Sequence, residues 1–173
     1  MRTISELIEE GFRNTHLNIL VFGPKIATIS EDEKVRNLQN KRIVIRVELE
    51  RLGHFVRYAE DLVDPNLPSP QNNAALQEIL IMGEYDLIIN IVDTPGTIIE
   101  AALIAIKPNL ANKTSLFIDN AYTSGLAAST CELAKLSGAE CHYYQYPEDL
   151  VDCHLLGYVI RHVEKTQLVK FIS

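Results

Sequence analysis

The sequence predicts a three-layer α/β domain built on a five-stranded, mainly parallel, doubly wound sheet of the flavodoxin or Rossmann type. Short β-rich runs alternate five times with helical stretches of ten or more residues, which is the pattern of βαβ units. One run, 86–92 (DLIINIV), is apolar on both faces after its first residue, as in the centre of a parallel sheet. The length of 173 residues suits one compact domain, so we expect a single domain over residues 1–173.

The first part of the chain is expected to give a short helix, a strand and a long helix. The amphipathic segment 1–15 should form a helix that packs on the domain or on a partner. Residues 17–22 (LNILVF) are typical of a buried strand, which Gly23 and Pro24 end. A rough helical stripe then predicts a helix over 35–52. The stripe consists of Val35, Leu38, Ile43, Val47 and Leu49.

The middle of the chain is expected to hold two strands and a long loop. Residues 54–59 (HFVRYA) predict the second strand. The loop 60–73 holds three prolines, which exclude regular structure there. Long loops in compact domains are often functional. A helix over about 73–83 then leads into the third strand, 86–92.

The rest of the chain continues the alternation of helices and strands. The expected elements are a helix from Asp93 to about 106, a strand at 114–119, a helix at about 122–137, a strand at 139–146 and a helix from 147 to about 165. Because strands and helices alternate, the sheet should be parallel, with helices on both faces.

Composition and charge limit the classes of function. A formal net charge of -7 argues against a nucleic-acid-binding surface, because neutralising phosphates needs a basic face. Small molecules or proteins are therefore the expected partners. The sequence has no apolar run long enough to span a bilayer and no signal-peptide pattern, so we expect a cytoplasmic protein with reduced thiols.

Four loops are the candidate ligand sites. In doubly wound sheets, ligands bind beyond the carboxyl ends of the strands, where the strand order reverses. The loops that begin at Gly23, Glu60, Asp93 and Asn120 follow expected strands and lie at that edge.

The segment 93–100 (DTPGTIIE) carries the strongest chemical signal. Thr94 suits a helix N-cap, and Gly96 would let an anionic ligand reach the exposed backbone amides. Glu100 follows about one turn inside the helix, where we expect the helix dipole to favour its ionised form. The residues around Glu100 are apolar, which favours a carboxylate placed for function over a solvated one that only stabilises the helix start.

The run YDLIINIVDTPGTIIE (85–100) resembles the nucleoside 2-deoxyribosyltransferase family and the wider SLOG and TIR-like group. The resemblance covers roughly 17–125, including a first strand that ends in glycine, a helix that ends before Gly53-His54, and an acidic loop after the second strand. The run is also similar to the Pro-Gly-Gly-x-Gly-Thr-x-x-Glu motif of lysine-decarboxylase-like nucleotide phosphoribohydrolases, but it has a single glycine before the threonine.

The resemblance implies cleavage or transfer at an N-glycosidic bond of a nucleotide, a nucleoside or NAD. Glu100 matches the family's nucleophile, which attacks the anomeric carbon of the sugar. Asp93 would bind sugar hydroxyls or assist the leaving base as an acid. Members of the group often serve as antiviral defence effectors, and their sites are often completed by a neighbouring subunit, so a homo-oligomer or a subunit of a larger complex is expected.

Other residues of the four loops are candidates for substrate binding, with ordinary loop or cap roles as the alternative. The candidates are Gly23, Pro24, Glu60, Asp61, Thr94, Gly96, Thr97, Asn120 and Tyr122. Lys41, Arg42 and Arg46 could face a phosphate, although charges on a helix are usually its solvated face. No cofactor is expected, and no metal site, because Cys141 and His142 would point to opposite faces of a strand.

Two other functions remain open. The first is a nucleotide sensor or regulatory subunit that binds at the same crevice without chemistry, which would need a separate effector partner. The second is a receiver-like or structural scaffold, which is disfavoured because no acidic pair follows the first strand.

Overall fold

A computed structural model describes residues 2–151 and 154–173, and it confirms the predicted α/β class. The five strands are β1 (Asn18–Phe22), β2 (Phe55–Tyr58), β3 (Leu87–Val92), β4 (Thr114–Asp119) and β5 (Glu140–Tyr144). They form one sheet in the order β2-β1-β3-β4-β5, and every neighbouring pair is parallel. The strand order reverses between β1 and β3, and the carboxyl ends of those two strands are the place where doubly wound sheets generally bind ligands.

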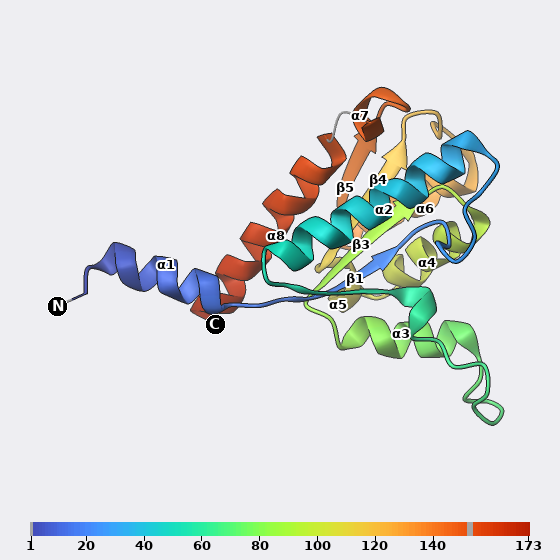
Figure 1. Ribbon diagram of the computed structural model, residues 1–173. Coiled ribbons are helices and arrows are strands. Elements are labelled where there is room, and N and C mark those ends of the chain that lie inside the picture. The colour runs from blue at the N-terminus through green and yellow to red at the C-terminus, as the bar shows by residue number, and fades with distance from the viewer. Residues whose placement is uncertain (1, 152–153) are drawn as a thin grey trace.

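Helices cover both faces of the sheet (Figure 1). The helices α2 (Glu33–Arg51) and α8 (His154–Ile172) pack on one face, with core residues such as Ile45 and Val159. The helices α3 (Ala74–Gly83), α4 (Pro95–Ala105) and α6 (Gly125–Leu136) pack on the other face, with Met82, Ala101 and Cys131 in its core. Short helical segments complete the chain, namely η1 (Ala59–Asp61), α5 (Pro108–Ala111) and α7 (Glu148–Val151).

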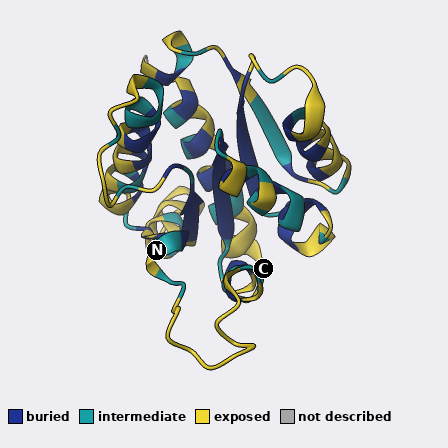
Figure 2. Cartoon of the chain, turned by 90° about the vertical axis from the view of Figure 1, so that its right-hand side faces the viewer, coloured by how far each residue is buried: buried dark blue, intermediate teal, exposed yellow. Residues whose placement is uncertain are grey.

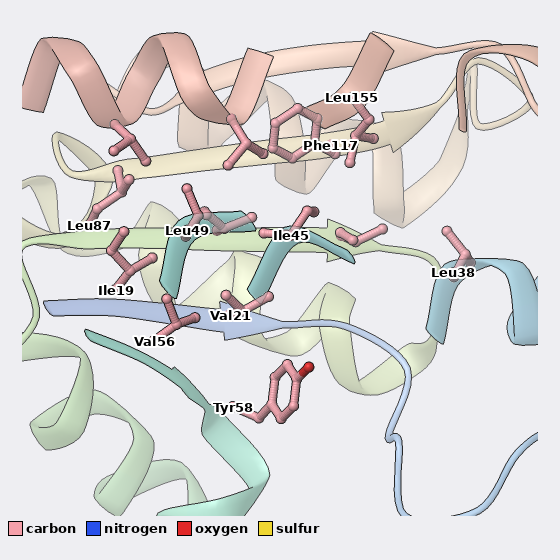
Figure 3. Close-up of a cluster of buried hydrophobic side chains, with 14 of the residues drawn as sticks. Ile19, Val21, Leu38, Ile45, Leu49, Val56, Tyr58, Leu87, Phe117 and Leu155 are labelled. Atoms are coloured by element: carbon pink, nitrogen blue, oxygen red, sulfur yellow. The ribbon is translucent and has the colours of Figure 1, made fainter. Parts of the chain in front are cut away.

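The central strands are buried on both faces, as the apolar run at 86–92 predicted. All residues of β3 and β4 are buried, and Figure 2 shows the centre of the sheet in dark blue beneath partly exposed helices. Successive side chains alternate between the two cores: Ile19, Leu87 and Phe117 face the side of α2 and α8 (Figure 3). Leu20 and Ile88 face the opposite side.

Several element boundaries differ from the sequence prediction. In the described residues, the helix predicted from residue 147 to about 165 comprises α7 and α8, which lie on either side of residues 152–153, and α8 continues to Ile172. The short helix α5 was not predicted between the helix that ends at about 106 and the strand at 114–119; Pro108 starts it, and proline suits the first turn of a helix. The loop 60–73 was expected to lack regular structure, but the 3-10 turn η1 includes its first two residues.

Helix α2 presents only part of the predicted stripe to the sheet. Ile43 and Val47 are exposed, whereas Leu38, Ile45 and Leu49 are buried. The same buried face contains Arg42, whose side chain is fully buried. The alternative that the cations of this helix form its solvated face is therefore wrong for Arg42, and Lys41 is buried as well. A helix with mixed apolar positions allows two faces, and tertiary packing selects one of them.

The N-terminal helix α1 (Ile4–Asn14) projects from the sheet beside the C-terminal end of α8 (Figure 1). A capping box between Thr3 and Glu6 starts it. No residue of α1 is buried, and its contacts to α8 include the Phe12 and Phe171 rings, whose centroids lie 6.2 Å apart. In the described part of the chain, no helix has the length and apolar character that crossing a membrane requires.

We expect Gly23→Ala to destabilise the fold by about 1–3 kcal/mol. A Cβ on Gly23 would lie 2.5 Å from Cδ of Arg42, and that buried side chain is held too firmly to move aside. Gly83→Ala is the matched control, because a Cβ on Gly83 meets nothing within 4 Å. Urea denaturation of both variants measures the difference, and equal midpoints for the two would contradict this role of Gly23.

Candidate functional site

The carboxyl end of β1 is closed by the Arg42 guanidinium. Nη1 donates to the carbonyl oxygens of Gly23 and Pro24 at 3.0 and 2.6 Å, and Nη2 donates to that of Val21 at 2.9 Å. Both nitrogens also donate to the Glu60 carboxylate, at 2.9 and 2.8 Å, which makes a bidentate pair. The predicted residues Gly23, Pro24 and Glu60 therefore meet at one buried cation.

Glu100 lies on the second turn of α4, and the charges of Arg42 and Glu60 both act on its carboxyl group. The pKa of Glu100 is raised to about 8, first by burial and then by the Glu78 charge from α3, while Arg42 opposes the shift and Glu60 adds to it. The Oε2 atom of Glu100 is buried and has no hydrogen-bond partner among the described residues. The carboxyl group is thus held neutral near pH 7.

The expected effect of the helix dipole on Glu100 is therefore outweighed. The dipole acts mainly on the first turn, and Glu100 is the sixth residue of α4. At that depth, burial destabilises the charged form of Glu100 by more than the helix dipole stabilises it. Glu100 was expected to be ionised in the folded protein, and this expectation is wrong at neutral pH because the group is buried beside two other carboxylates.

The start of α4 satisfies most of its own backbone amides. Thr94 caps the helix and accepts from the Thr97 amide, and the Thr97 hydroxyl oxygen accepts from the amides of Asp93 and Thr94 at 2.9 Å. Gly96 is exposed, but of its two neighbours Pro95 has no N–H group and the Thr97 amide already donates to Thr94. Few free backbone N–H groups therefore remain at this turn to bind an anion, and its main role is to cap the helix.

Asp93 belongs to a second cluster, centred on Lys34 in the first turn of α2. The Lys34 ammonium lies 2.8 Å from Asp93 and 2.8 Å from Asp119 at the end of β4. Tyr122 joins the cluster, since its hydroxyl donates to Asp93 at 3.2 Å and its ring lies under the ammonium. Burial lowers the pKa of Lys34, but hydrogen bonds and charge from both aspartates outweigh burial and raise that pKa above its ordinary value.

The predicted site residues therefore divide into groups. Glu60, Gly23 and Pro24 surround Arg42 near Glu100, while Tyr122 and Asp93 surround Lys34. Asp61 and Asn120 are exposed and join neither set of contacts.

Three residues of these two clusters were missed as site residues, namely Lys34, Glu78 and Asp119. Arg42 was named only as a residue that could face a phosphate, with the solvated face of its helix as the alternative, and Lys34 precedes the helix predicted over 35–52. Asp119 and Glu78 were placed in elements without a role. One signal pointed to Lys34: a lysine in the first turn of a helix is opposed by the helix dipole, so it implies nearby carboxylates.

A buried amide adjoins the start of α4. Asn90 on β3 is fully buried, and its Nδ2 donates to the Thr97 carbonyl oxygen at 3.1 Å. Its Oδ1 has no hydrogen-bond partner among the described residues. On the face of the sheet that α4 covers, Oδ1 of Asn90 and Oε2 of Glu100 therefore both lack a hydrogen-bond partner among the described residues. A bound polar ligand or water would satisfy them.

A serine, a histidine and a glutamate also meet away from this edge, but they do not form a hydrolytic triad. Ser115 and Glu140 both approach the same nitrogen of His162, Nδ1, whereas a relay needs both ring nitrogens. Ser115 is also fully buried. Within the described residues no group of His, Cys, Asp and Glu side chains could hold a metal ion.

We expect Glu100→Gln to change the pH dependence of stability. The folded-state pKa of about 8 lies above the ordinary value of 4.5, so the stability that this group contributes is fully present below about pH 4.5. That contribution is lost as pH rises to about 8, by about 1.4 kcal/mol per pH unit. Glutamine cannot ionise. The free energy of unfolding of the variant should therefore rise relative to that of the wild type across this window, and the difference should stay constant above it.

Urea denaturation at several pH values between about 5 and 9 measures this difference. Glu132→Gln, at an exposed glutamate of α6, is the matched control and should follow the wild type throughout. Parallel curves for Glu100→Gln and the wild type would show that the carboxyl group is not held neutral.

Comparison with known proteins assigns no family to this chain. No protein-family model matches it, and a search of the curated proteins finds no match. The chemistry of the site is therefore inferred from the residues at the carboxyl edge of the sheet.

Proposed function

We propose that this protein breaks or transfers an N-glycosidic bond of a nucleoside, a nucleotide or NAD, with the Glu100 carboxylate as nucleophile. The observation that carries the proposal is a buried carboxyl group with an unpaired oxygen beside the switch point of a doubly wound sheet, with its pKa raised to about 8. Strongly shifted carboxyl groups in such crevices are candidates for catalysis.

The reaction would proceed in two displacements. Glu100 first gives its proton to solvent water. An oxygen of the resulting carboxylate then forms a bond to the anomeric carbon while the bond from that carbon to the base nitrogen breaks, and the base leaves with the electron pair and takes a proton from water. Water or a second base then attacks the same carbon, gives up a proton, and releases Glu100 as a carboxylate. Water as the acceptor yields hydrolysis, and a base yields transfer.

The shifted pKa suits this chemistry. A carboxylate poorly solvated in the free protein interacts strongly with positive charge that develops on the sugar, because little water competes for it. The transition state for N-glycosidic cleavage carries such charge. A neutral Glu100 in the resting state is therefore compatible with a nucleophile that ionises when a cationic centre is near.

Asp93 is better suited to binding than to proton donation. Its ion pair with Lys34 favours a carboxylate that accepts hydrogen bonds, such as those from sugar hydroxyls. Glu60 is similarly engaged with Arg42 through both of its oxygens. These two acidic groups would orient a sugar, and Glu100 would react with it.

A nucleotide-binding subunit without catalysis is the second candidate, and the start of α4 favours it. The amides of that turn are largely satisfied within the chain, so little is left to hold a phosphate during turnover. Calorimetry with nucleotides separates the two functions: saturable binding with no released base supports the binding subunit.

We expect Glu100→Gln to lower release of base or nicotinamide by about a thousandfold or more, because an amide cannot act as the nucleophile. Mass spectrometry of a mixed pool of nucleosides, nucleotides and NAD incubated with protein identifies substrate and product together. Glu132→Gln should retain full turnover. Unchanged turnover in folded Glu100→Gln would end the proposal.

The pH profile gives an independent prediction for the same site. The nucleophile must be ionised, so kcat/KM should rise with pH toward the Glu100 pKa of about 8. Glu78→Gln removes a charge that raises this pKa, so the midpoint of the profile should move to lower pH. A midpoint that stays in place in this variant would contradict the assignment of that pKa to Glu100.

A further inference from the structure

A pocket of about 450 Å³ lies between β5 and α8, on the sheet face opposite α4. Its lining includes Phe117, His142 and Tyr144 from the strands, and Gly157, Tyr158 and Arg161 from α8. Neither Glu100 nor Asp93 lines it. Its volume falls within the range of small-molecule sites, which is about 300–1,000 Å³.

Three stacked rings form one wall of this pocket. The Phe117 and His142 rings have centroids 5.2 Å apart with an interplanar angle of 21°, and those of His142 and Tyr158 are 4.7 Å apart at 28°. Phe117 is fully buried and anchors the stack in the core next to Leu155 (Figure 3). Burial lowers the pKa of His142, so the wall is uncharged at neutral pH. Such a wall suits a planar aromatic ligand.

One cation at the pocket lacks a carboxylate partner. The Arg161 guanidinium lies 5.3 Å from the Tyr158 ring centroid, and it forms no salt bridge with the residues that the structure describes. The nearby acids are paired with other groups, and one of these pairs lies in the pocket itself, because Asp149 and His154 both line it. Asp149 pairs with His154 at 2.9 Å, and Glu140 pairs with Lys165. Arg161 therefore remains to receive an anion.

Two buried polar atoms of the lining residues also lack partners. The His142 Nε2 atom and the Tyr144 hydroxyl have no hydrogen bond to the described residues. The nearest carboxylate to that nitrogen is Glu140, at 3.8 Å, which is too long for a hydrogen bond. A ligand with a ring nitrogen or another polar ring atom would satisfy one of these groups.

We propose that this pocket is a second ligand site, which binds a small planar aromatic anion. Phe117 and Tyr158 cover the two faces of the His142 ring, so the ligand ring would pack against the edges of the stacked rings, and the anionic group would pair with Arg161. Combined ring packing and charge pairing is what distinguishes such a ligand from a neutral ring or a simple inorganic anion. The site is independent of the proposed chemistry at Glu100.

Gly157 provides a selective way to test the pocket. A Cβ added at this position meets nothing within 4 Å, so a larger side chain can enter the open space without a clash. Gly157→Leu should therefore fill the pocket and leave the fold intact. Gly157→Ala is the matched control, because it adds one methyl group and leaves most of the space open.

The experiment is a titration with nicotinate and nicotinamide, followed by NMR chemical shifts of the full chain. The two probes share a ring and differ in charge. We expect nicotinate to bind about fivefold more tightly than nicotinamide, and Arg161→Gln to remove most of that preference. Gly157→Leu should weaken nicotinate binding by about tenfold or more, while Gly157→Ala changes it little.

Glu100→Gln should leave nicotinate binding unchanged, which separates this pocket from the switch-point site. Three results would overturn the proposal: no saturable binding of nicotinate to the wild type, equal affinity for both probes, or full binding by folded Gly157→Leu. Arg161 is exposed, so its variant should remain folded, and the dispersion of the same NMR spectra checks this.

Discussion

The buried guanidinium of Arg42 is the constraint on which the ligand edge of this protein depends. A fully buried cation is costly unless its hydrogen bonds and charge are satisfied, and here three carbonyl oxygens and both oxygens of Glu60 accept from the two terminal nitrogens, while Nε has no partner among the described residues. The same requirement explains Gly23, because any side chain there would meet Arg42. The end of β1, the start of the loop after β2 and the middle of α2 are thereby joined at one point.

That arrangement also sets the chemistry of Glu100. Arg42 is the one positive charge among the groups that shift its pKa, and much of that charge is already compensated by Glu60. Glu78 adds a second negative neighbour. Glu100 is therefore left without a full counter-ion in a poorly solvated place, and it binds a proton more tightly than an exposed glutamate does. The neighbouring Lys34 cluster has the opposite balance, since one ammonium there faces two carboxylates.

The sequence allowed much of the fold to be predicted, because its strongest signals are local. Apart from Asn90, the run at 86–92 is apolar throughout β3, and the alternation of strands and helices implies a parallel sheet. Glu100 could be singled out because an ionisable residue in an apolar helix is conspicuous. Its protonation could not be predicted, because it depends on Glu78 and Arg42, which lie far away in the sequence. The buried face of α2 was predicted only in part for a similar reason: Ile43 and Val47 compete with Ile45 for the core, and only packing decides between them.

The central claim is that Glu100 is a buried carboxyl group held neutral at the switch point of the sheet. The most direct test is a 13C NMR titration of the glutamate side-chain carboxyl carbons, with the Glu100 signal assigned from its loss in Glu100→Gln. The account predicts that this signal titrates with a pKa of about 8. Titration at or below the ordinary value of 4.5 would contradict it.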